Sequence, residues 1–153
     1  MRNRSRPLLA LGLSALSPLL SAAAPAPAAQ VQVNVTVTDL RNSKGVVRAC
    51  MTANPERFPR CRDDAASFRL VVPAEEHITL QFANVRPGTY AIALLHDEND
   101  NGRADRALMM MPREGFGFSR DAPVHMGPPD FEEAAFAVGS AAVRQTIRMR
   151  YML

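Results

Sequence analysis

The sequence predicts an all-β protein: an antiparallel, seven-stranded β-sandwich of the immunoglobulin-like or prealbumin-like class, with one long loop and at most a short helix. Three observations predict this class. Several segments alternate apolar and polar residues with a period of two, which is typical of strands with one buried face. Turn residues separate these segments, and helical periodicity is almost absent. The 153 residues, of which 47% are hydrophobic, suffice for one folded domain and are short for two.

Residues 1–28 are expected to be a signal peptide, and residues 29–153 a single β-sandwich domain. Arginines come first, an apolar stretch from Pro7 to Leu20 follows, and small residues end the segment. The alternative is a retained anchor, but the apolar stretch is shorter than the roughly 20 residues that span a bilayer. We therefore expect an exported protein, periplasmic or secreted, with no transmembrane segment.

The charge balance disfavours nucleic acid as a partner. Lys and Arg total 18 against 15 Asp and Glu, but Arg2, Arg4 and Arg6 lie in the expected signal peptide. Without these three arginines the positive and negative residues are equal in number. The mature protein is therefore not expected to bind nucleic acid.

The first strand is expected from Val31 to Val37, where valines at alternate positions share one face. A turn at residues 42–45 leads to a second strand, over residues 47–53, with Cys50 on the face opposite to its apolar residues. An even cysteine count in an oxidising compartment predicts a disulfide between Cys50 and Cys61, outside the main core. This bridge is expected to contribute roughly 3 kcal/mol of stability. The alternatives, metal ligands or a redox pair, lack a close C-x-x-C spacing or a neighbouring histidine.

Five further strands are expected, at residues 68–72, 78–85, 89–96, 134–138 and 145–152. Pro87-Gly88 is expected to join two of them in a hairpin. The run from Tyr90 to Leu95 is apolar at both odd and even positions, which predicts a central strand covered on both faces. Asp130 is expected to cap the short helix, over residues 131–135.

The long loop from Asp97 to Asp130 is expected to carry the function, since connections beyond about 15 residues are often functional. Its first segment, Asp97–Asp105, matches the start of a calcium-binding loop, with oxygen-bearing residues at alternate positions and a glycine for the sharp turn. The expected Ca²⁺ ligands are the side chains of Asp97, Asn99, Asn101 and Asp105, the backbone carbonyl of Arg103, and Glu114 as an additional candidate. Leu108 occupies the position of the final glutamate of an EF-hand, which excludes that motif. The alternative is a solvated acidic turn without metal.

Phe116 and Phe118 alternate with glycines, so they either pin the long loop onto the domain or form an aromatic platform for a protein or glycan partner. Together with His96 and Ser119 they are the candidate recognition surface. One alternative is a small periplasmic hydrolase using His96 and Ser119, although Ser119 lacks the nucleophile-elbow motif and no catalytic residue is assigned. Another is a carrier with a small apolar ligand inside the sandwich. A copper site is a third alternative, with the candidate ligands His96, Met109, Met110, Met111, His125 and Met126.

Three ordered motifs carry a family resemblance: HDENDNGRAD at residues 96–105, PREGFGFS at residues 112–119 and GPPDFEEA at residues 127–134. With the turn at residues 87–90, they resemble the bacterial exported family called domain of unknown function 2141, over about residues 31–151. The resemblance implies a secreted β-sandwich and no particular activity, substrate or catalytic residue. Met109–Met111 depart from the glycine-containing approach expected before Pro112. The sequence thus predicts an exported binding or structural module of unspecified ligand and oligomeric state, with a calcium-stabilised loop.

Overall fold

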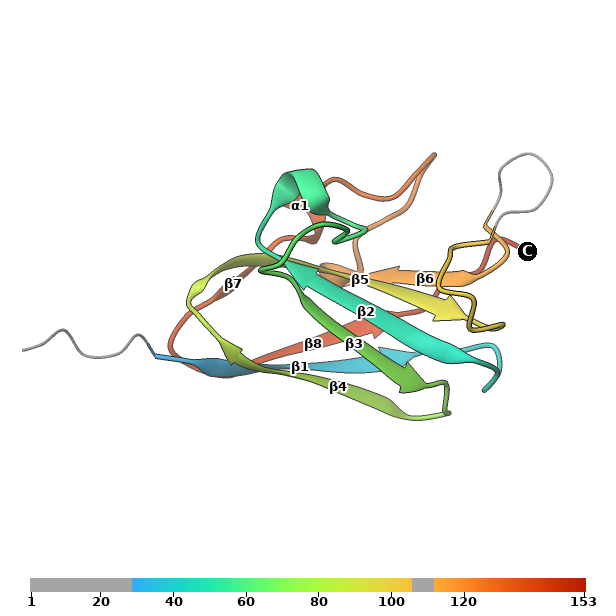
Figure 1. Cartoon of the computed structure of the whole chain (residues 1–153), viewed down its shortest axis with the longest axis horizontal. Coiled ribbons are helices and arrows are strands. Elements are labelled where there is room, and N and C mark those ends of the chain that lie inside the picture. The colour runs from blue at the N-terminus through green and yellow to red at the C-terminus, as the bar shows by residue number, and fades with distance from the viewer. Residues whose placement is uncertain (1–28, 106–111) are drawn as a thin grey trace, which may run out of the picture.

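The computed structural model describes residues 29–105 and 112–153, which form two β-sheets (Figure 1). The three-stranded sheet has the order β4 (Ile78–Val85), β1 (Val31–Thr38) and β8 (Val143–Arg148). The other sheet has the order β3 (Phe68–Pro73), β2 (Val46–Thr52), β5 (Gly88–Asp97) and β6 (Gly115–Phe118), and β7 (Phe136–Val138) pairs with the start of β5. The strands pair antiparallel, except that β8 runs parallel to β1.

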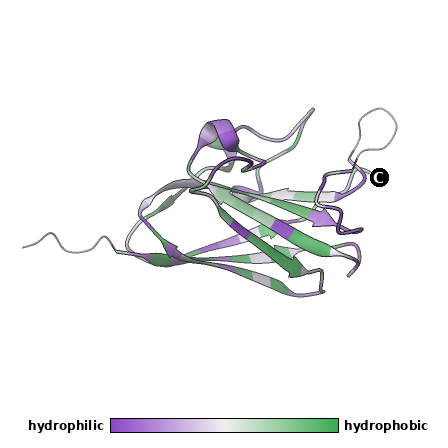
Figure 2. Ribbon diagram, viewed as in Figure 1, coloured by the Kyte–Doolittle hydropathy of each residue, from purple (hydrophilic) through white to green (hydrophobic). Residues whose placement is uncertain are grey.

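One hydrophobic core receives side chains from both sheets. The alternating valines of β1 bury one face, and the residues Val47, Ala49 and Met51 of β2 bury theirs against the same cluster. Figure 2 shows the apolar residues concentrated along the strands and the hydrophilic ones in the connections. The alternation in the sequence therefore identifies the core-facing side of these strands correctly.

The mostly β, mostly antiparallel architecture is confirmed, but the structure has eight strands and not seven. The missed strand is β6, inside the predicted long loop, where every second residue is glycine and intrinsic strand propensity is low. Packing requires these glycines. A Cβ at Gly117 would lie 2.7 Å from Cγ2 of Ile147, and one at Gly115 would lie 2.3 Å from Cε1 of Tyr151. The end of the chain thus packs directly on the backbone of β6.

The predicted hairpin around Pro87-Gly88 is wrong. Strand β4 pairs with β1, whereas β5 pairs with β2, β6 and β7, so this turn carries the chain from one sheet to the other. A Pro-Gly signal indicates that the chain changes direction but does not specify the next strand's partner. The prediction of a central strand is confirmed, because β5 lies between β2 and β6 and buries residues on both faces.

The short helix is also confirmed, as α1 (Phe131–Ala134), one residue shorter than expected. Asp130 is its N-cap, and the carboxylate of Glu133 accepts a hydrogen bond from the backbone N–H of Asp130 at 3.0 Å. Two short 3-10 turns, η1 (Pro55–Arg57) and η3 (Ser119–Asp121), lie in the connections. Within residues 29–105 and 112–153, no helix has the length and hydrophobicity needed to cross a membrane.

Candidate functional site

The candidate site lies on the outer face of the five-stranded sheet, opposite to the core. Strand register aligns side chains on this face in two adjacent rows across the sheet. The first row is Arg69, Cys50, Ala93 and Phe118, and the second is Val71, Arg48, Leu95 and Phe116. Both rows line a groove of about 420 Å³, which we call the sheet groove. Sites for small ligands have volumes of about 300–1,000 Å³, so the size is suitable for one.

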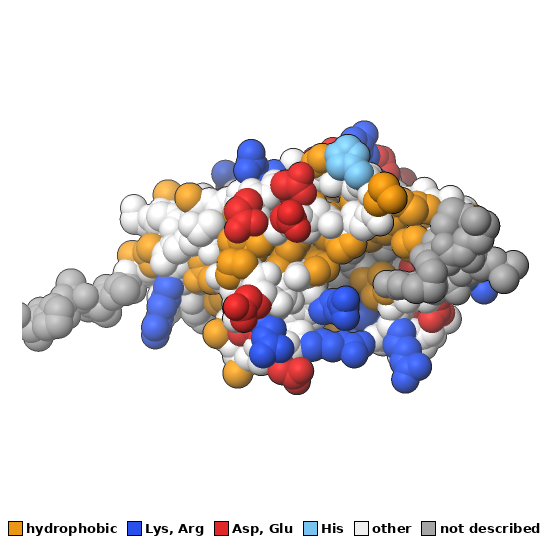
Figure 3. Space-filling view, turned by 90° about the horizontal axis from the view of Figure 1, so that it is seen from above, with side chains coloured by type: hydrophobic (Ala, Val, Ile, Leu, Met, Phe, Trp, Pro, Cys, Tyr) orange, Lys and Arg blue, Asp and Glu red, His pale blue; other side chains and the backbone are white. Residues whose placement is uncertain are grey.

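Apolar side chains form much of the floor of the sheet groove. Val71 is 54% exposed although it lies in a strand, and Leu95 and Phe116 are half-buried. Figure 3 views the molecule from this side and shows a band of hydrophobic side chains with basic side chains beside it. Val71 lies on the edge strand β3, and Arg48 of β2 separates it from Leu95 and Phe116. Exposed apolar area beside polar residues is commonly a binding surface.

A second, smaller hydrophobic cluster covers the neighbouring part of the same sheet face. Phe118 packs there with helix α1 and with Phe58, whose ring centroid is 5.9 Å from that of Phe118 and 6.0 Å from that of Phe131 in edge-to-face geometry. Phe118 is only 5% exposed, whereas Phe116 is half-buried. Phe118 therefore fixes β6 and its surroundings, and Phe116 is the ring more open to the groove.

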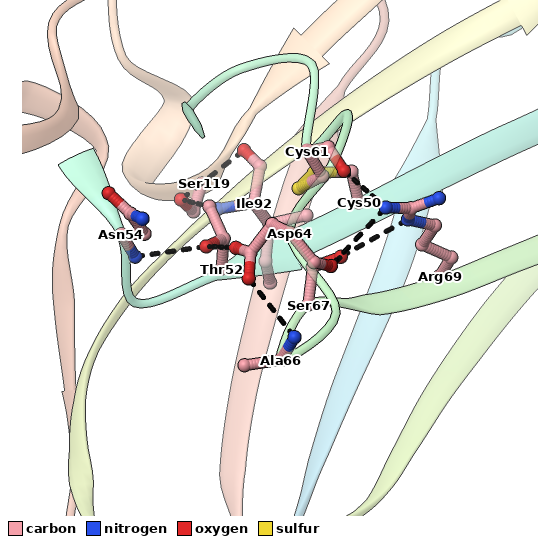
Figure 4. Close-up of a disulfide and its surroundings, with 10 residues drawn as sticks. All are labelled: Cys50, Thr52, Asn54, Cys61, Asp64, Ala66, Ser67, Arg69, Ile92 and Ser119. Atoms are coloured by element: carbon pink, nitrogen blue, oxygen red, sulfur yellow. Dashed lines mark hydrogen bonds between the residues drawn. A yellow bond between two sulfur atoms is a disulfide. The ribbon is translucent and has the colours of Figure 1, made fainter. Parts of the chain in front are cut away.

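One wall of the groove is the disulfide loop, residues 50–62. Cys50 and Cys61 form a disulfide, and Cys61 is buried. The guanidinium of Arg69 donates to the carbonyl of Cys61, and its Nε donates to Oγ of Ser67 at 3.1 Å (Figure 4). These contacts hold the loop against strand β3 and place Pro59 at the groove.

The opposite wall is the acidic loop, residues 97–105, which is anchored through Asp97. The carboxylate of Asp97 is fully buried and accepts hydrogen bonds from Nε of Arg48 at 2.7 Å and from the backbone N–H groups of Gly102 and Asn101 at 2.8 and 3.0 Å. Burial raises the pKa of Asp97, but the hydrogen bonds outweigh burial and the pKa lies below its ordinary value. Arg48 also contacts Oδ1 of Asp100 at 2.6 Å. An arginine of the groove floor thus fixes the acidic loop.

The carboxylates predicted as calcium ligands lie near one another. Glu114 is 5% exposed, and its Oε2 accepts the backbone N–H of Asp105 at 3.1 Å. Burial raises the pKa of Glu114, and the charges of Asp97 and Asp105 raise it further. The amide groups of Asn99 and Asn101 donate to Oδ2 of Asp105 at 2.8 and 2.9 Å. In the part of the chain that the structure describes, no group of three or more acidic, histidine or cysteine side chains could hold a metal ion as arranged.

His96 is fully buried and does not reach the predicted recognition surface. Its Nε2 lies 2.8 Å from the carbonyl oxygen of Lys44, so Nε2 carries the proton and donates it. The hydroxyl of Tyr151 then donates to Nδ1 at 2.7 Å. This residue ties the β1–β2 turn and the end of the chain to strand β5.

Ser119 is fully buried as well. Its Oγ accepts the backbone N–H of Ile92 at 2.9 Å, a contact visible in Figure 4, and donates to the carbonyl of Ala134 at 2.6 Å. Both hydroxyl functions are thus used inside the fold, and His96 is not among the partners. The structure does not bring the two residues of the hydrolase hypothesis together.

The remaining predicted residues are dispersed or not described. His125 and Met126 are exposed in the connection before α1, whereas His96 is buried and both of its ring nitrogens are bonded to Lys44 and Tyr151. Met109, Met110 and Met111 lie outside the described residues, as do Leu108 and the expected signal peptide, residues 1–28. The carrier hypothesis placed its ligand between the sheets, whereas the sheet groove lies on an outer face.

Sequence reasoning missed the arginines of the groove. Five of them line it: Arg48, Arg60, Arg62, Arg69 and Arg103. The sequence did contain a signal for two of them: Arg48 and Arg69 occupy outward-facing positions in strands whose other residues are mostly apolar. The sequence alone does not show that β2 and β3 are neighbours, because their pairing is set by the tertiary fold.

The family comparison places the chain among bacterial proteins without a described activity. The family model "Uncharacterized protein conserved in bacteria (DUF2141)" matches residues 35–146. No curated protein and no solved structure matches the chain.

Proposed function

The chain belongs to the uncharacterized bacterial family DUF2141, and because that membership specifies no activity, we propose from the geometry that it is an exported binding module whose sheet groove binds a small ligand with an apolar body. One observation carries the proposal: no residue of 29–105 or 112–153 covers the apolar floor of the groove, which lies between two loops that are each held in place. Fixed walls reduce the ordering cost of binding, which favours a ligand site over an adaptable surface.

Two features support export. Residues 1–28 have the order of a secretory signal peptide, and disulfides such as Cys50–Cys61 are typical of proteins in oxidising compartments. We further propose that the two sheets form a sandwich of the immunoglobulin-like or prealbumin-like class, because their facing residues belong to a single hydrophobic cluster.

The binding proposal is tested with phenylnaphthylamine, an uncharged apolar fluorophore. We expect saturable binding to the full chain, and we expect Val71→Trp to weaken it because the indole fills the groove from an exposed edge-strand position. Thr79→Trp is the matched control, since Thr79 is exposed on the edge strand of the other sheet. Equal binding by both variants would contradict the proposal.

A second proposal concerns calcium, and the closeness of Asp97, Asp105 and Glu114 favours it. Ca²⁺ binds hard oxygen ligands, and a cation would offset the repulsion between Glu114 and Asp105, whereas Asp97 is already paired with Arg48. The amide nitrogens of Asn99 and Asn101 point at Asp105, while their oxygens accept the backbone N–H groups of Asn101 and Arg103. Calcium binding would therefore require both amides to rotate and to exchange these hydrogen bonds for the ion. In this proposal the ion stabilises the acidic loop and does not take part in a reaction.

Calorimetric titration of Ca²⁺ into chelator-treated protein tests the calcium proposal. We expect heat of binding and a higher melting temperature, both lost in Glu114→Gln. Glu132→Gln is the control, because Glu132 is exposed on α1 and outside the acidic loop. Absence of heat and of thermal stabilisation at millimolar Ca²⁺ would refute the calcium proposal and leave the binding proposal unaffected.

A further inference from the structure

The charged residues that line the sheet groove are arginines. Five of them do so, and among residues 29–105 and 112–153 no aspartate or glutamate lines the groove. This arrangement is not a consequence of composition, because beyond the first six residues the chain has equal numbers of basic and acidic residues. Basic side chains are therefore concentrated at the apolar groove.

Most of this positive charge has no acidic partner. Arg48 is neutralised by Asp97 and Asp100. Within the described residues, Arg69 donates to Oγ of Ser67 and to the backbone carbonyls of Cys61 and Asp64 and forms no salt bridge, so its charge is oriented but not balanced. Arg60, Arg62 and Arg103 are exposed and form no salt bridge within residues 29–105 and 112–153; the remaining pairs in that range are Arg41–Glu98, Arg148–Asp121 and Arg150–Asp121.

We propose that the sheet groove binds a small anionic amphiphile, a molecule with an apolar body and one carboxylate, sulfonate or phosphate group. The apolar body lies on Val71, Leu95 and Phe116, and the anionic group faces Arg60 and Arg62 of the disulfide loop. This inference rests on the proposed function, because it specifies the ligand of the same groove.

The chemistry of arginine supports an anionic ligand. The guanidinium is always charged, presents a planar fork of donors that matches the oxygens of carboxylates and phosphates, and loses less hydration energy than an ammonium. Arginines next to apolar surface also pack their methylene stems against a ligand's apolar part. A small molecule is favoured over a macromolecular surface because loops wall the floor on two sides and the volume is about 420 Å³.

The test compares two fluorophores with the same aromatic skeleton. Anilinonaphthalenesulfonate carries a sulfonate, and phenylnaphthylamine does not. We expect the sulfonate to bind the full chain more tightly, and its dissociation constant to rise with salt, because only its binding includes a charge interaction. Near-ultraviolet circular dichroism of each variant verifies native packing, since the sulfonate also binds loosely packed states.

Paired substitutions separate charge from shape. In Arg60→Gln/Arg62→Gln, we expect the dissociation constant of the sulfonate to rise roughly 3- to 10-fold, because two solvent-screened charge interactions are lost. The dissociation constant of phenylnaphthylamine is expected to stay within about 2-fold of its wild-type value. Arg86→Gln/Arg144→Gln is the control, because it removes the same charge from two exposed positions outside the groove. Val71→Trp is expected to weaken both probes by more than about 10-fold.

The failures of the two proposals differ. If Val71→Trp weakens both probes but the arginine substitutions change neither, the groove binds apolar ligands and the anionic inference is refuted. If Val71→Trp changes neither probe, the proposed function itself is refuted. Arginine-dependent binding to phosphatidylglycerol vesicles without binding of the soluble sulfonate would also overturn the inference, and would assign the face to a membrane. Self-association abolished by Val71→Trp would assign it to a second copy of the chain.

Discussion

Replacement of Arg48 by methionine tests whether the Arg48–Asp97 pair holds the acidic loop to the sheet. The variant keeps the aliphatic stem and removes the guanidinium, so the fully buried carboxylate of Asp97 retains only the N–H groups of Gly102 and Asn101. Loss of one partner of a fully buried pair costs about 3–5 kcal/mol, and a hydrogen bond to a charged group contributes about 1.5–3 kcal/mol. Because the Arg48 side chain is 32% exposed, solvent screens the pair and we expect about 2–3 kcal/mol.

Thermal and urea unfolding at neutral pH measure this loss. At about 4 °C per kcal/mol for a domain of this size, the melting temperature is expected to fall by about 8–12 °C. The pKa of Asp97 is lowered in the folded protein, so its contribution is present above the ordinary pKa of the carboxyl, 3.8, and is lost as the pH falls through the lowered value. The difference between wild type and Arg48→Met is therefore expected to shrink on acidification.

Two controls make the result decisive. Arg144→Met removes an exposed arginine of β8 whose side chain forms no salt bridge or hydrogen bond in the described part of the chain, and is expected to change stability by less than about 0.5 kcal/mol. Adding Asp97→Asn to Arg48→Met removes the unpaired buried charge and is expected to restore part of the lost stability. Equal melting temperatures for Arg48→Met and Arg144→Met, or a pH-independent difference, would refute the anchoring role.

Three further predictions concern the loops and their supports. Cys50→Ser/Cys61→Ser is expected to lower the free energy of unfolding by roughly 3 kcal/mol relative to oxidised wild type, as measured by urea unfolding. Equal stability of the variant, reduced wild type and oxidised wild type would contradict this. Gly45→Ala is expected to cost more than about 2 kcal/mol, since φ is +66° and the new Cβ would lie 2.0 Å from the carbonyl oxygen of Asp97, whereas Gly139→Ala, with open space around its Cβ, serves as the control. The raised pKa of Glu114 means that its stabilising effect is present below the ordinary value of 4.5 and is lost as the pH rises through the higher folded value. In metal-free buffer Glu114→Gln is therefore expected to melt at an equal or higher temperature than wild type at neutral pH, and a lower melting temperature would contradict this.

Local pattern predicted much of the fold. The alternation in β1 and β2, the doubly apolar run of β5 and the cap at Asp130 each depend on residues close in sequence, and each appears in the structure as expected. Partner choice was not predictable in this way. The turn at Pro87-Gly88 changes sheets, and β8 joins β1 in parallel, because pairing depends on how the apolar faces of distant segments meet.

The site was predictable only in part. The spacing of acidic and amide residues identified the acidic loop, but it did not reveal that a buried arginine interaction anchors Asp97. His96 and Ser119 were chosen for their chemistry, and burial, which no single-residue property reports, removes both from the surface. The arginines of the groove come from two strands and two loops that are adjacent only in the fold.

Amide chemical-shift mapping with anilinonaphthalenesulfonate tests the central claim most directly. Stepwise addition of the probe to the isotope-labelled full chain is expected to shift the amide signals of Val71, Leu95 and Phe116 and those of the two walls, residues 59–62 and 102–104, while β1, β4 and β8 stay unchanged. Shifts centred on β1, β4 or β8, or spread evenly over both sheets, would contradict the assignment of the sheet groove as the ligand site.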